Sequence, residues 1–234
     1  MNDQIAEILK GSFDLHVHAS PDAAQDRRLD ALETARQAYE AEMAGFVLKS
    51  HEYPTAPLAY ALGRMYPGLN VAGAIALNKS VGGINPDAVE VSAKLGARVV
   101  WMPSFDADAW LTRAGIGPGI TIVDEHGQLY PAVRDVLDLI REHDMVLASG
   151  HVSPIEAIAL FKAAKEIGIT RMIATHPTNV ATIEQQHEMA SLGAYLEHTF
   201  LASMPARATE SVDDLVASLT TLGMDRCVVT TDFG

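Results

Sequence analysis

An α/β barrel of eight parallel strands, the (β/α)8 or TIM-type fold, is the fold class that this sequence predicts. Segments typical of buried strands alternate with segments of helical period along the chain, the pattern of parallel strands joined by crossover helices. Eight strand segments favour a closed barrel over the alternative, an open doubly wound sheet. The 234 residues are 48% hydrophobic, and we expect them to form a single domain, 1–234.

The first half of the chain contains four strand segments. A short helix at about 3–10 precedes the first of them. Leu29–Ala44 has apolar residues near helical spacing, and Gly45 ends it. Asn85 before Pro86 is a helix start, with a capping side chain before a proline at the first helical position. The strands expected here are 12–17, 45–50, 70–77 and 97–102, separated by helices at 29–44, 57–65 and 85–96.

The alternation is interrupted between Pro103 and Tyr130. Glycines at 115, 117 and 119 precede a short apolar run and a turn at 124–127. We expect an excursion with a short hairpin at about 103–130; a substrate loop and an insertion without function both remain open. The repeat then resumes. The strands expected are 145–149, 171–175, 194–198 and 226–231, with helices at 131–143, 154–167, 182–191 and 211–222.

Charge and composition limit the partners. The formal net charge of −13 repels phosphate backbones, which argues against nucleic acid. No apolar run approaches the roughly 18 residues of a membrane helix, and the N-terminus lacks the pattern of a signal peptide. We therefore expect a cytoplasmic protein that acts on a small molecule, with no membrane or nucleic-acid partner; homo-oligomer formation stays open. Cys227 is the only cysteine, so no intrachain disulfide can form.

Two histidines end the first strand, in the stretch Phe13–His18. Side chains alternate along a strand, so Asp14 should share a face with His16 and His18, while Leu15 and its apolar neighbours take the other face. Two imidazoles on one face can bind a single metal ion. An isolated pair of this kind is only a hypothesis, and the rest of the chain has to support it.

The C-terminal ends of barrel strands face one mouth, where the catalytic residues of this fold gather. Six of the nine histidines lie at predicted strand ends, together with two carboxylates, two lysines and an asparagine. These residues are His16, His18, Lys49, His51, Asn78, Lys79, His151, His176, Glu197, His198 and Asp232. We interpret His198 as a core or supporting residue, and His126, His143 and His187 as solvated.

Five of these residues resemble, strand for strand, the metal ligands of the metal-dependent hydrolases of the amidohydrolase superfamily. They are His16 and His18 on the first strand, His151 on the fifth, His176 on the sixth and Asp232 on the eighth. Many two-metal members use a carboxylated lysine on strand four, but here that strand is Arg98–Met102, without lysine. The resemblance leaves Lys49, His51 or Glu197 as bridging or second-metal ligands, or a single metal.

A second resemblance concerns the first two strands. Residues 14–18, a helix and then Gly45–His51 are similar to the opening of the polymerase and histidinol phosphatase family, in which strand two also ends in a metal-binding histidine. This resemblance implies a phosphoesterase with up to three metals. His51 fits this family better, whereas His176 and Asp232 fit the amidohydrolase superfamily better.

The donor types indicate the cofactor. Neutral imidazole and carboxylate suit Zn²⁺, with Mn²⁺ or Fe²⁺ as alternatives, as one or two ions. Zinc lowers the pKa of bound water to about 7. We expect the resulting hydroxide to attack an amide, ester or lactone carbonyl. The catalytic candidates are Asp232 and His176, and Asp232 should pass the proton to the leaving group. A single-metal decarboxylase and a non-catalytic binding protein are the other classes that stay open.

Substrate clues come from cationic residues near the predicted mouth. These are Arg27, Arg28, Lys49, Lys79 and Arg113, in an otherwise acidic protein. They suit a small anionic substrate with a carboxylate or phosphate, and Lys79 and Arg113 are the candidates for binding it. Lys49 shares a strand face with His51 and should point into the barrel.

The outer face of the eighth strand needs a cover. Cys227, Val229 and Thr231 should face outward, and each Å² of apolar area left in water forfeits roughly 25 cal/mol. The cover could be the N-terminal helix, a neighbouring subunit, or a C-terminal segment that lies outside this sequence. We expect the last of these, so the barrel would lack its final helix within residues 1–234.

Overall fold

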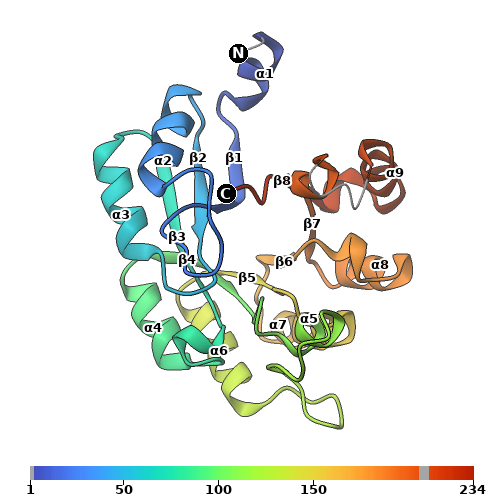
Figure 1. Cartoon of the computed structure of the whole chain (residues 1–234). Helices are drawn as coiled ribbons and strands as arrows, with labels where there is room; N and C mark the ends of the chain where they lie inside the picture. The colour runs from blue at the N-terminus through green and yellow to red at the C-terminus, as the bar shows by residue number, and fades with distance from the viewer. Residues whose placement is uncertain (1–2, 206–210) are drawn as a thin grey trace.

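The computed structural model describes residues 3–205 and 211–234 and shows an eight-stranded parallel barrel with helices on its outside (Figure 1). Each strand pairs with the next strand in the chain, in the order β1 to β8. An open doubly wound sheet would reverse its strand order, so the predicted barrel is confirmed. The strands are β1 (Phe13–His18), β2 (Gly45–Lys49), β3 (Asn70–Ala76), β4 (Ala97–Trp101), β5 (Val146–Ala148), β6 (Met172–Ala174), β7 (Tyr195–Thr199) and β8 (Cys227–Thr230).

Helices follow the strands and pack around the barrel, apart from α1, which stands away from it (Figure 1). The α-helices are α1 (Asp3–Leu9), α2 (Ala31–Glu40), α3 (Ala56–Met65), α4 (Pro86–Lys94), α5 (Asp108–Arg113), α6 (Pro131–Glu142), α7 (Pro154–Glu166), α8 (Ile183–Ser191) and α9 (Val212–Leu222). Short 3₁₀ helices are η1 (Lys79–Val81), η2 (Pro177–Asn179), η3 (Phe200–Ser203) and η4 (Met224–Arg226). Among the helices of the described ranges, none has the length and apolar character needed to cross a bilayer.

The helix expected at 29–44 is shorter at both ends. It begins after Asp30, whose side chain accepts a hydrogen bond from the backbone N–H of Glu33, and it ends at Glu40. Glu42 has a φ of 53°, which no continuing helix can accommodate. The segment 103–130 contains the expected short hairpin, with one antiparallel bridge between Val123 and Leu129, and in addition the helix α5, which was not expected.

Two apolar layers hold the barrel. The outer layer lies between strands and helices, where Val100 and Leu147 belong to the same buried cluster as Leu137 and Phe161. Fully burying one such Leu or Phe is worth about 1.5–3 kcal/mol. The inner layer fills the barrel with mostly small side chains and the large Trp101, which is almost fully buried. The polar residues of the mouth lie on this apolar floor.

Strands β1 and β8 close the barrel at the mouth. The backbone N–H of Asp232 donates to the carbonyl of His16 at 2.9 Å, and the N–H of His18 donates to the carbonyl of Phe233 at 2.7 Å. These bonds place the proposed catalytic aspartate beside the first strand, as expected from barrel closure. Asp232 therefore reaches its neighbours through tertiary structure alone.

The side-chain alternation expected for β1 is wrong at two positions. The pairing of β1 with β2 shifts register between Asp14 and Val17, an irregularity of the kind a β-bulge produces. Leu15 consequently packs with the apolar interior of the barrel rather than on its outside. Asp14 does not face the mouth either: its carboxylate accepts a 2.6 Å hydrogen bond from the Thr231 hydroxyl at the seam with β8. His16 and His18 still point to the mouth.

The outer face of β8 is partly exposed. Val229 keeps 54% of its surface accessible. Helix α1 is not the cover, because Ile5 and Ile8 on it are themselves exposed.

Candidate metal centre

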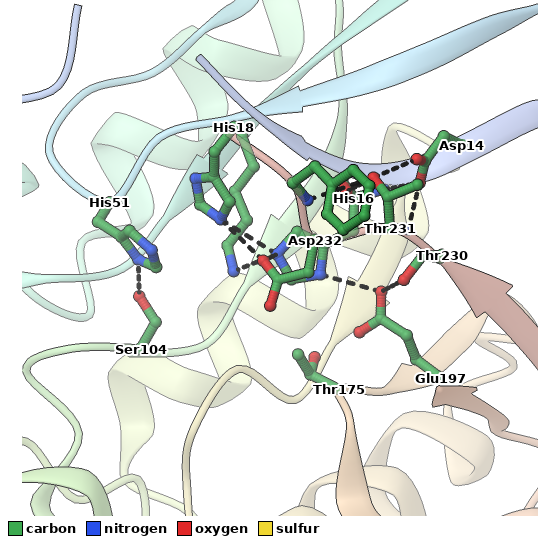
Figure 2. A network of polar contacts seen from close by, with 12 residues as sticks. Asp14, His16, His18, His51, Ser104, Thr175, Glu197, Thr230, Thr231 and Asp232 are labelled. Atoms are coloured by element: carbon green, nitrogen blue, oxygen red, sulfur yellow. Dashed lines mark hydrogen bonds and ion pairs between the residues drawn. The ribbon is translucent and has the colours of Figure 1, made fainter. Parts of the chain in front are cut away.

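Three side chains from the two ends of the chain meet at the barrel mouth (Figure 2). The Nε2 atoms of His16 and His18 lie 3.2 Å apart. Asp232 Oδ1 lies 3.1 Å from the first of these nitrogens and 3.3 Å from the second. The two imidazoles are buried, while the Asp232 carboxylate keeps 18% of its surface exposed. The group is therefore open on the side of the aspartate.

The spacing of these three donors fits a divalent metal. Edges of 3.1, 3.2 and 3.3 Å are nearly those of one face of a regular tetrahedron. The centre of such a tetrahedron lies about 2.0 Å from each corner, which is the usual Zn–N and Zn–O distance. Two imidazoles and one carboxylate are also donors that zinc accepts, and three protein donors leave one position of a tetrahedral ion for water or substrate.

The second nitrogen of His16 is held by a buried carboxylate. His16 Nδ1 lies 3.0 Å from Oε1 of Glu197, and the Thr230 hydroxyl donates to the same oxygen at 2.9 Å (Figure 2). An ionised carboxylate cannot donate a hydrogen bond, so Nδ1 carries the proton of the ring. The lone pair of Nε2 then points toward His18 and Asp232. Metal-binding histidines usually have such a partner, which fixes the tautomer and the ring orientation. In this position Glu197 orients His16.

Protonation states also suit a metal. Burial lowers the pKa of His18 to about 3, so its imidazole is neutral at physiological pH. Burial alone would raise the pKa of Asp232, but His16, His18, His176 and Lys49 outweigh it and hold that pKa well below its usual range. The site thus offers a neutral imidazole at His18 and an ionised carboxylate at Asp232, the forms that bind metal.

Both residues that we expect to be catalytic have left-handed backbone conformations. The φ angle is 53° at Asp232 and 29° at His176. Such angles cost energy for residues other than glycine, and they are found where surrounding structure holds a functional side chain in place. The backbone strain supports a role for these two positions.

Lys49 projects from β2 into the same group. Its side chain is almost fully buried, and its Nζ lies 2.9 Å from Nε2 of His16. The ammonium also lies 5.0 Å from the centre of the Trp101 ring. Burial lowers the pKa of Lys49 to about 8, although the carboxylates of Asp232 and Glu197 oppose this shift. The predicted inward orientation of Lys49 is what the structure shows.

His51 faces the pocket through a chain of hydrogen bonds. Asn78 Oδ1 accepts from the backbone N–H groups of Ser104 and Asp106, so its amide nitrogen must be the group that faces Ser104 Oγ at 2.8 Å. Ser104 Oγ therefore accepts from Asn78 and has its own proton left for Nδ1 of His51, 2.7 Å away. Burial lowers the pKa of His51, so the ring is neutral and carries its proton on Nε2. Ser104 was not among the residues predicted from the sequence, although it lies only two residues after the end of the fourth predicted strand.

His151 and His176 lie further along the pocket. Their ring centres are 4.9 Å apart, and His176 stacks on His16 at 6.2 Å. Neither belongs to the close three-donor group, and their metal-binding role stays a prediction. His151 Nδ1 is buried without a hydrogen-bond partner among the described residues. Gly150 positions this histidine: it has a φ of 61°, and a Cβ there would lie 2.2 Å from the carbonyl oxygen of Met102.

The two residues predicted to bind substrate lie at the edge of the site. Lys79 is exposed, and its Nζ lies 3.8 Å from Oδ1 of Asp106. Arg113 is exposed on α5, 5.4 Å above the ring of Trp110, and lines a hollow beside His151 and His176. Their substrate-binding role stays a prediction.

His198 lies outside the three-donor group. It is buried, and its Nδ1 lies 3.1 Å from the hydroxyl of Thr178, which fits the supporting role expected for it.

A pocket of about 540 Å³, which includes a part open to solvent, has His18 and Asp232 of the three-donor group in its lining. The aromatic residues Phe105 and Trp110 come from the segment 103–130, so this excursion contributes to the site. The pocket is lined by His18, Gln25, Arg27, Lys49, His51, Phe105, Trp110, His151, His176, Leu201 and Asp232. The aromatic pair was not predicted, since nothing local in the sequence shows where the excursion folds back.

Comparisons with known proteins agree with the architecture. An amidohydrolase from Pseudomonas aeruginosa superposes with a TM-score of 0.68 at 12% identity, covering 100% of this chain and 77% of its own. The probable dipeptidase PvdM from the same organism gives 0.63 at 11%, covering 99% and 86%. An organophosphorus hydrolase from Deinococcus radiodurans gives 0.62 at 14%, covering 97% and 76%. At these identities the likeness shows the fold, and the predicted resemblance to the amidohydrolase superfamily is confirmed at that level.

Sequence comparison adds the family. No curated protein matches the sequence. One family model matches residues 11–197, a range that includes every strand from β1 to β6 and the first part of β7. The chain therefore belongs to this family, which is described as a family of unknown function (DUF6282).

Proposed function

We propose that this protein is a metal-dependent hydrolase that acts on an amide, ester or lactone bond of a small anionic substrate. The observation that carries the proposal is the triangle of His16, His18 and Asp232, whose edges suit a tetrahedral metal and of which His18 and Asp232 also line a pocket. The structural neighbours named as an amidohydrolase, a dipeptidase and an organophosphorus hydrolase support the same reaction class.

The metal would be held by the three-donor group, with His151 and His176 as further ligands. Zn²⁺ fits best, and Mn²⁺ or Fe²⁺ are the alternatives, as one or two ions. When bound, the ion supplies a Lewis acid and acidifies water. His151 Nδ1, which is buried without a hydrogen-bond partner in the described part of the chain, supports an additional ligand on that side of the pocket. Glu197 supports the site by orienting His16, which leaves a bridging role to Lys49 or His51 if a second ion binds.

Other steps of the reaction are assigned to side chains of the pocket. Asp232 is ionised and reaches the pocket, so it takes the proton from the attacking water and delivers it to the leaving atom of the substrate. His51 presents its Nε2–H as a donor for the carbonyl oxygen as charge develops there. Phe105 and Trp110 shield these groups from bulk water.

Replacing Ser104 tests the role of His51. Ser104→Ala removes the hydroxyl proton that sets the His51 tautomer in the described residues, so kcat should fall roughly tenfold while KM changes little. Ser104→Thr keeps the hydroxyl and should retain most of the activity. Ser92→Ala is the matched control, because Ser92 is equally buried but bonds a backbone carbonyl on α4. Equal kinetics for Ser104→Ala and wild type would rule out this role.

A phosphoesterase is the second candidate, favoured by the stacking of His51 on His18 with ring centres 4.6 Å apart. This arrangement would allow His51 to join a metal cluster, as the resemblance at the first two strands implies. A single-metal decarboxylase is a third candidate, which the single close donor group suits.

One experiment separates these reactions. The purified protein is analysed for bound metals and then assayed on carboxylated amides, lactones and phosphate esters, with release of CO₂ followed in parallel. We expect bound zinc, manganese or iron, turnover of an amide or lactone, loss of activity on chelation, and recovery on readdition of the metal. Turnover that survives complete chelation contradicts the proposal. Turnover of phosphate esters alone, or release of CO₂ alone, assigns the second or the third candidate.

A further inference from the structure

Arg27 lines the pocket but has no role in the hydrolase scheme. It lies in the loop between β1 and α2, and its side chain is only 7% exposed. Its Nε donates to Oδ2 of Asp22 at 2.6 Å. The terminal nitrogen Nη2 is buried and has no hydrogen-bond partner among the described residues.

A buried guanidinium with an unused N–H group is costly. Arginine stays charged in proteins and can only donate, so its unpaired N–H groups lose their hydration without compensation. Since Asp22 occupies the Nε side, the terminal nitrogens are the ones left for a further acceptor. A carboxylate accepts two parallel N–H bonds from such a pair.

The loop holds this guanidinium in a defined position. Asp22 Oδ1 accepts from the backbone N–H groups of Ala24 and Gln25, each at 2.9 Å, which orients the carboxylate that holds Arg27. The Tyr53 hydroxyl donates to the carbonyl of Pro21 at 3.0 Å and ties the loop to the segment after β2. A side chain that is positioned before binding loses little conformational freedom when the ligand arrives.

Other cations are less suited to this task. Lys79 is exposed and lies beside Asp106, and Arg113 is exposed above the ring of Trp110, outside the lining of this pocket. Lys49 lies against His16, inside the group proposed to hold the metal. In a protein with a net charge of −13, an anion needs a local cation to enter the pocket, and Arg27 supplies it.

An aromatic wall lines the same pocket. Phe105 stacks on His51 with ring centres 3.8 Å apart, and Trp110 lies 5.4 Å from Phe105 and 4.6 Å from His151. Flat apolar groups bind well against such rings. The pocket therefore combines a carboxylate-binding cation, an aromatic wall and the proposed metal group.

We propose that Arg27 binds a carboxylate of the substrate, and that the flat apolar part next to this carboxylate lies against Phe105 and Trp110. The substrate class is then a small aromatic or unsaturated carboxylic acid whose hydrolysable bond reaches Asp232. This inference rests on the proposed function only in taking the pocket as the substrate site; carboxylate binding itself can be measured without turnover.

The test compares benzoate with benzamide, which has the same ring but no charge. Calorimetric titration of the wild-type protein should show that benzoate binds at least about tenfold more tightly. In Arg27→Gln this preference should disappear through weaker binding of benzoate. Arg28→Gln is the matched control: it removes the same charge from the neighbouring, exposed position, and should bind benzoate as wild type does.

A second variant and a second titration condition complete the test. Arg27→Lys retains a charge beside Asp22 but loses the planar fork, so benzoate should bind more weakly than in wild type even if Arg27→Gln fails to fold. Titrations with and without chelator separate Arg27 from the metal, since the loss caused by Arg27→Gln should appear in both. Wild-type affinity for benzoate in the Arg27 variants overturns the proposal, as does binding of phenyl phosphate without binding of benzoate. If the protein binds benzoate through Arg27 but hydrolyses nothing, the proposed function fails and this inference stands.

Discussion

Asp232→Asn should lower kcat/KM roughly 10²- to 10⁴-fold, the range expected when a proton-transferring side chain is lost. The substitution keeps the shape of the side chain but removes the charge that lies 3.1 Å from His16 and 3.3 Å from His18. An amide oxygen cannot take up the proton, and it is a weaker metal ligand than a carboxylate. Metal affinity should therefore fall together with activity, as measured by kinetics and elemental analysis of the same preparation.

Asp225→Asn is the matched control for this variant. Asp225 is exposed on η4, close to β8 in sequence, and loses the same charge outside the pocket. It should keep wild-type activity and metal content. If Asp232→Asn retains kcat/KM within about twofold of wild type, Asp232 is neither the proton acceptor nor an essential ligand.

Glu197→Gln should weaken metal binding roughly 10- to 100-fold, the usual cost of losing a partner that orients a ligand. Glutamine can still accept the Nδ1–H of His16, but it no longer carries the charge that raises the basicity of the ring. The Thr230 hydroxyl would keep its acceptor, so the fold should persist. Metal affinity can be measured by competition with a chromogenic chelator.

The number of bound ions distinguishes the two roles predicted for Glu197. If this residue orients His16, the variant binds the same number of ions more weakly. If it bridges two ions, the variant loses one of them even at saturating metal. Glu125→Gln, in an exposed turn, is the control and should change neither quantity.

The alternation of strand and helix segments in the sequence was sufficient to predict the fold class. Alternating strand and helix segments predicted the barrel, and reading strand ends in turn placed His16, His18 and Asp232 at one mouth. Such predictions succeed because burial imposes a local period on strands and helices, and because parallel strands present their C-terminal ends on the same side. Boundaries were less accurate, since capping interactions such as that of Asp30 decide where a helix starts.

The local hydrophobic pattern could not predict where side chains stop alternating between the inside and the outside of the barrel. The register shift in β1 turns Leu15 into the barrel and leaves Asp14 bonded to Thr231, 217 positions away. A bulge depends on how neighbouring strands fit around the closed barrel, and this fit is a property of all eight strands. The sequence of β1 alone contains no sign of it.

Residue types at strand ends were determined by the sequence, and so was the chemistry that histidine and aspartate can perform together. The tertiary structure decided which atoms meet: Glu197 against His16, Ser104 against His51, and Arg27 between Asp22 and the pocket. These contacts join segments far apart in the chain or depend on the path of a loop, and each is set by barrel closure, rotamers and hydrogen-bond satisfaction rather than by local pattern. For this reason the candidate ligands could be predicted, whereas the contacts that orient them, and the position of Arg27 between Asp22 and the pocket, were decided only by the folded chain.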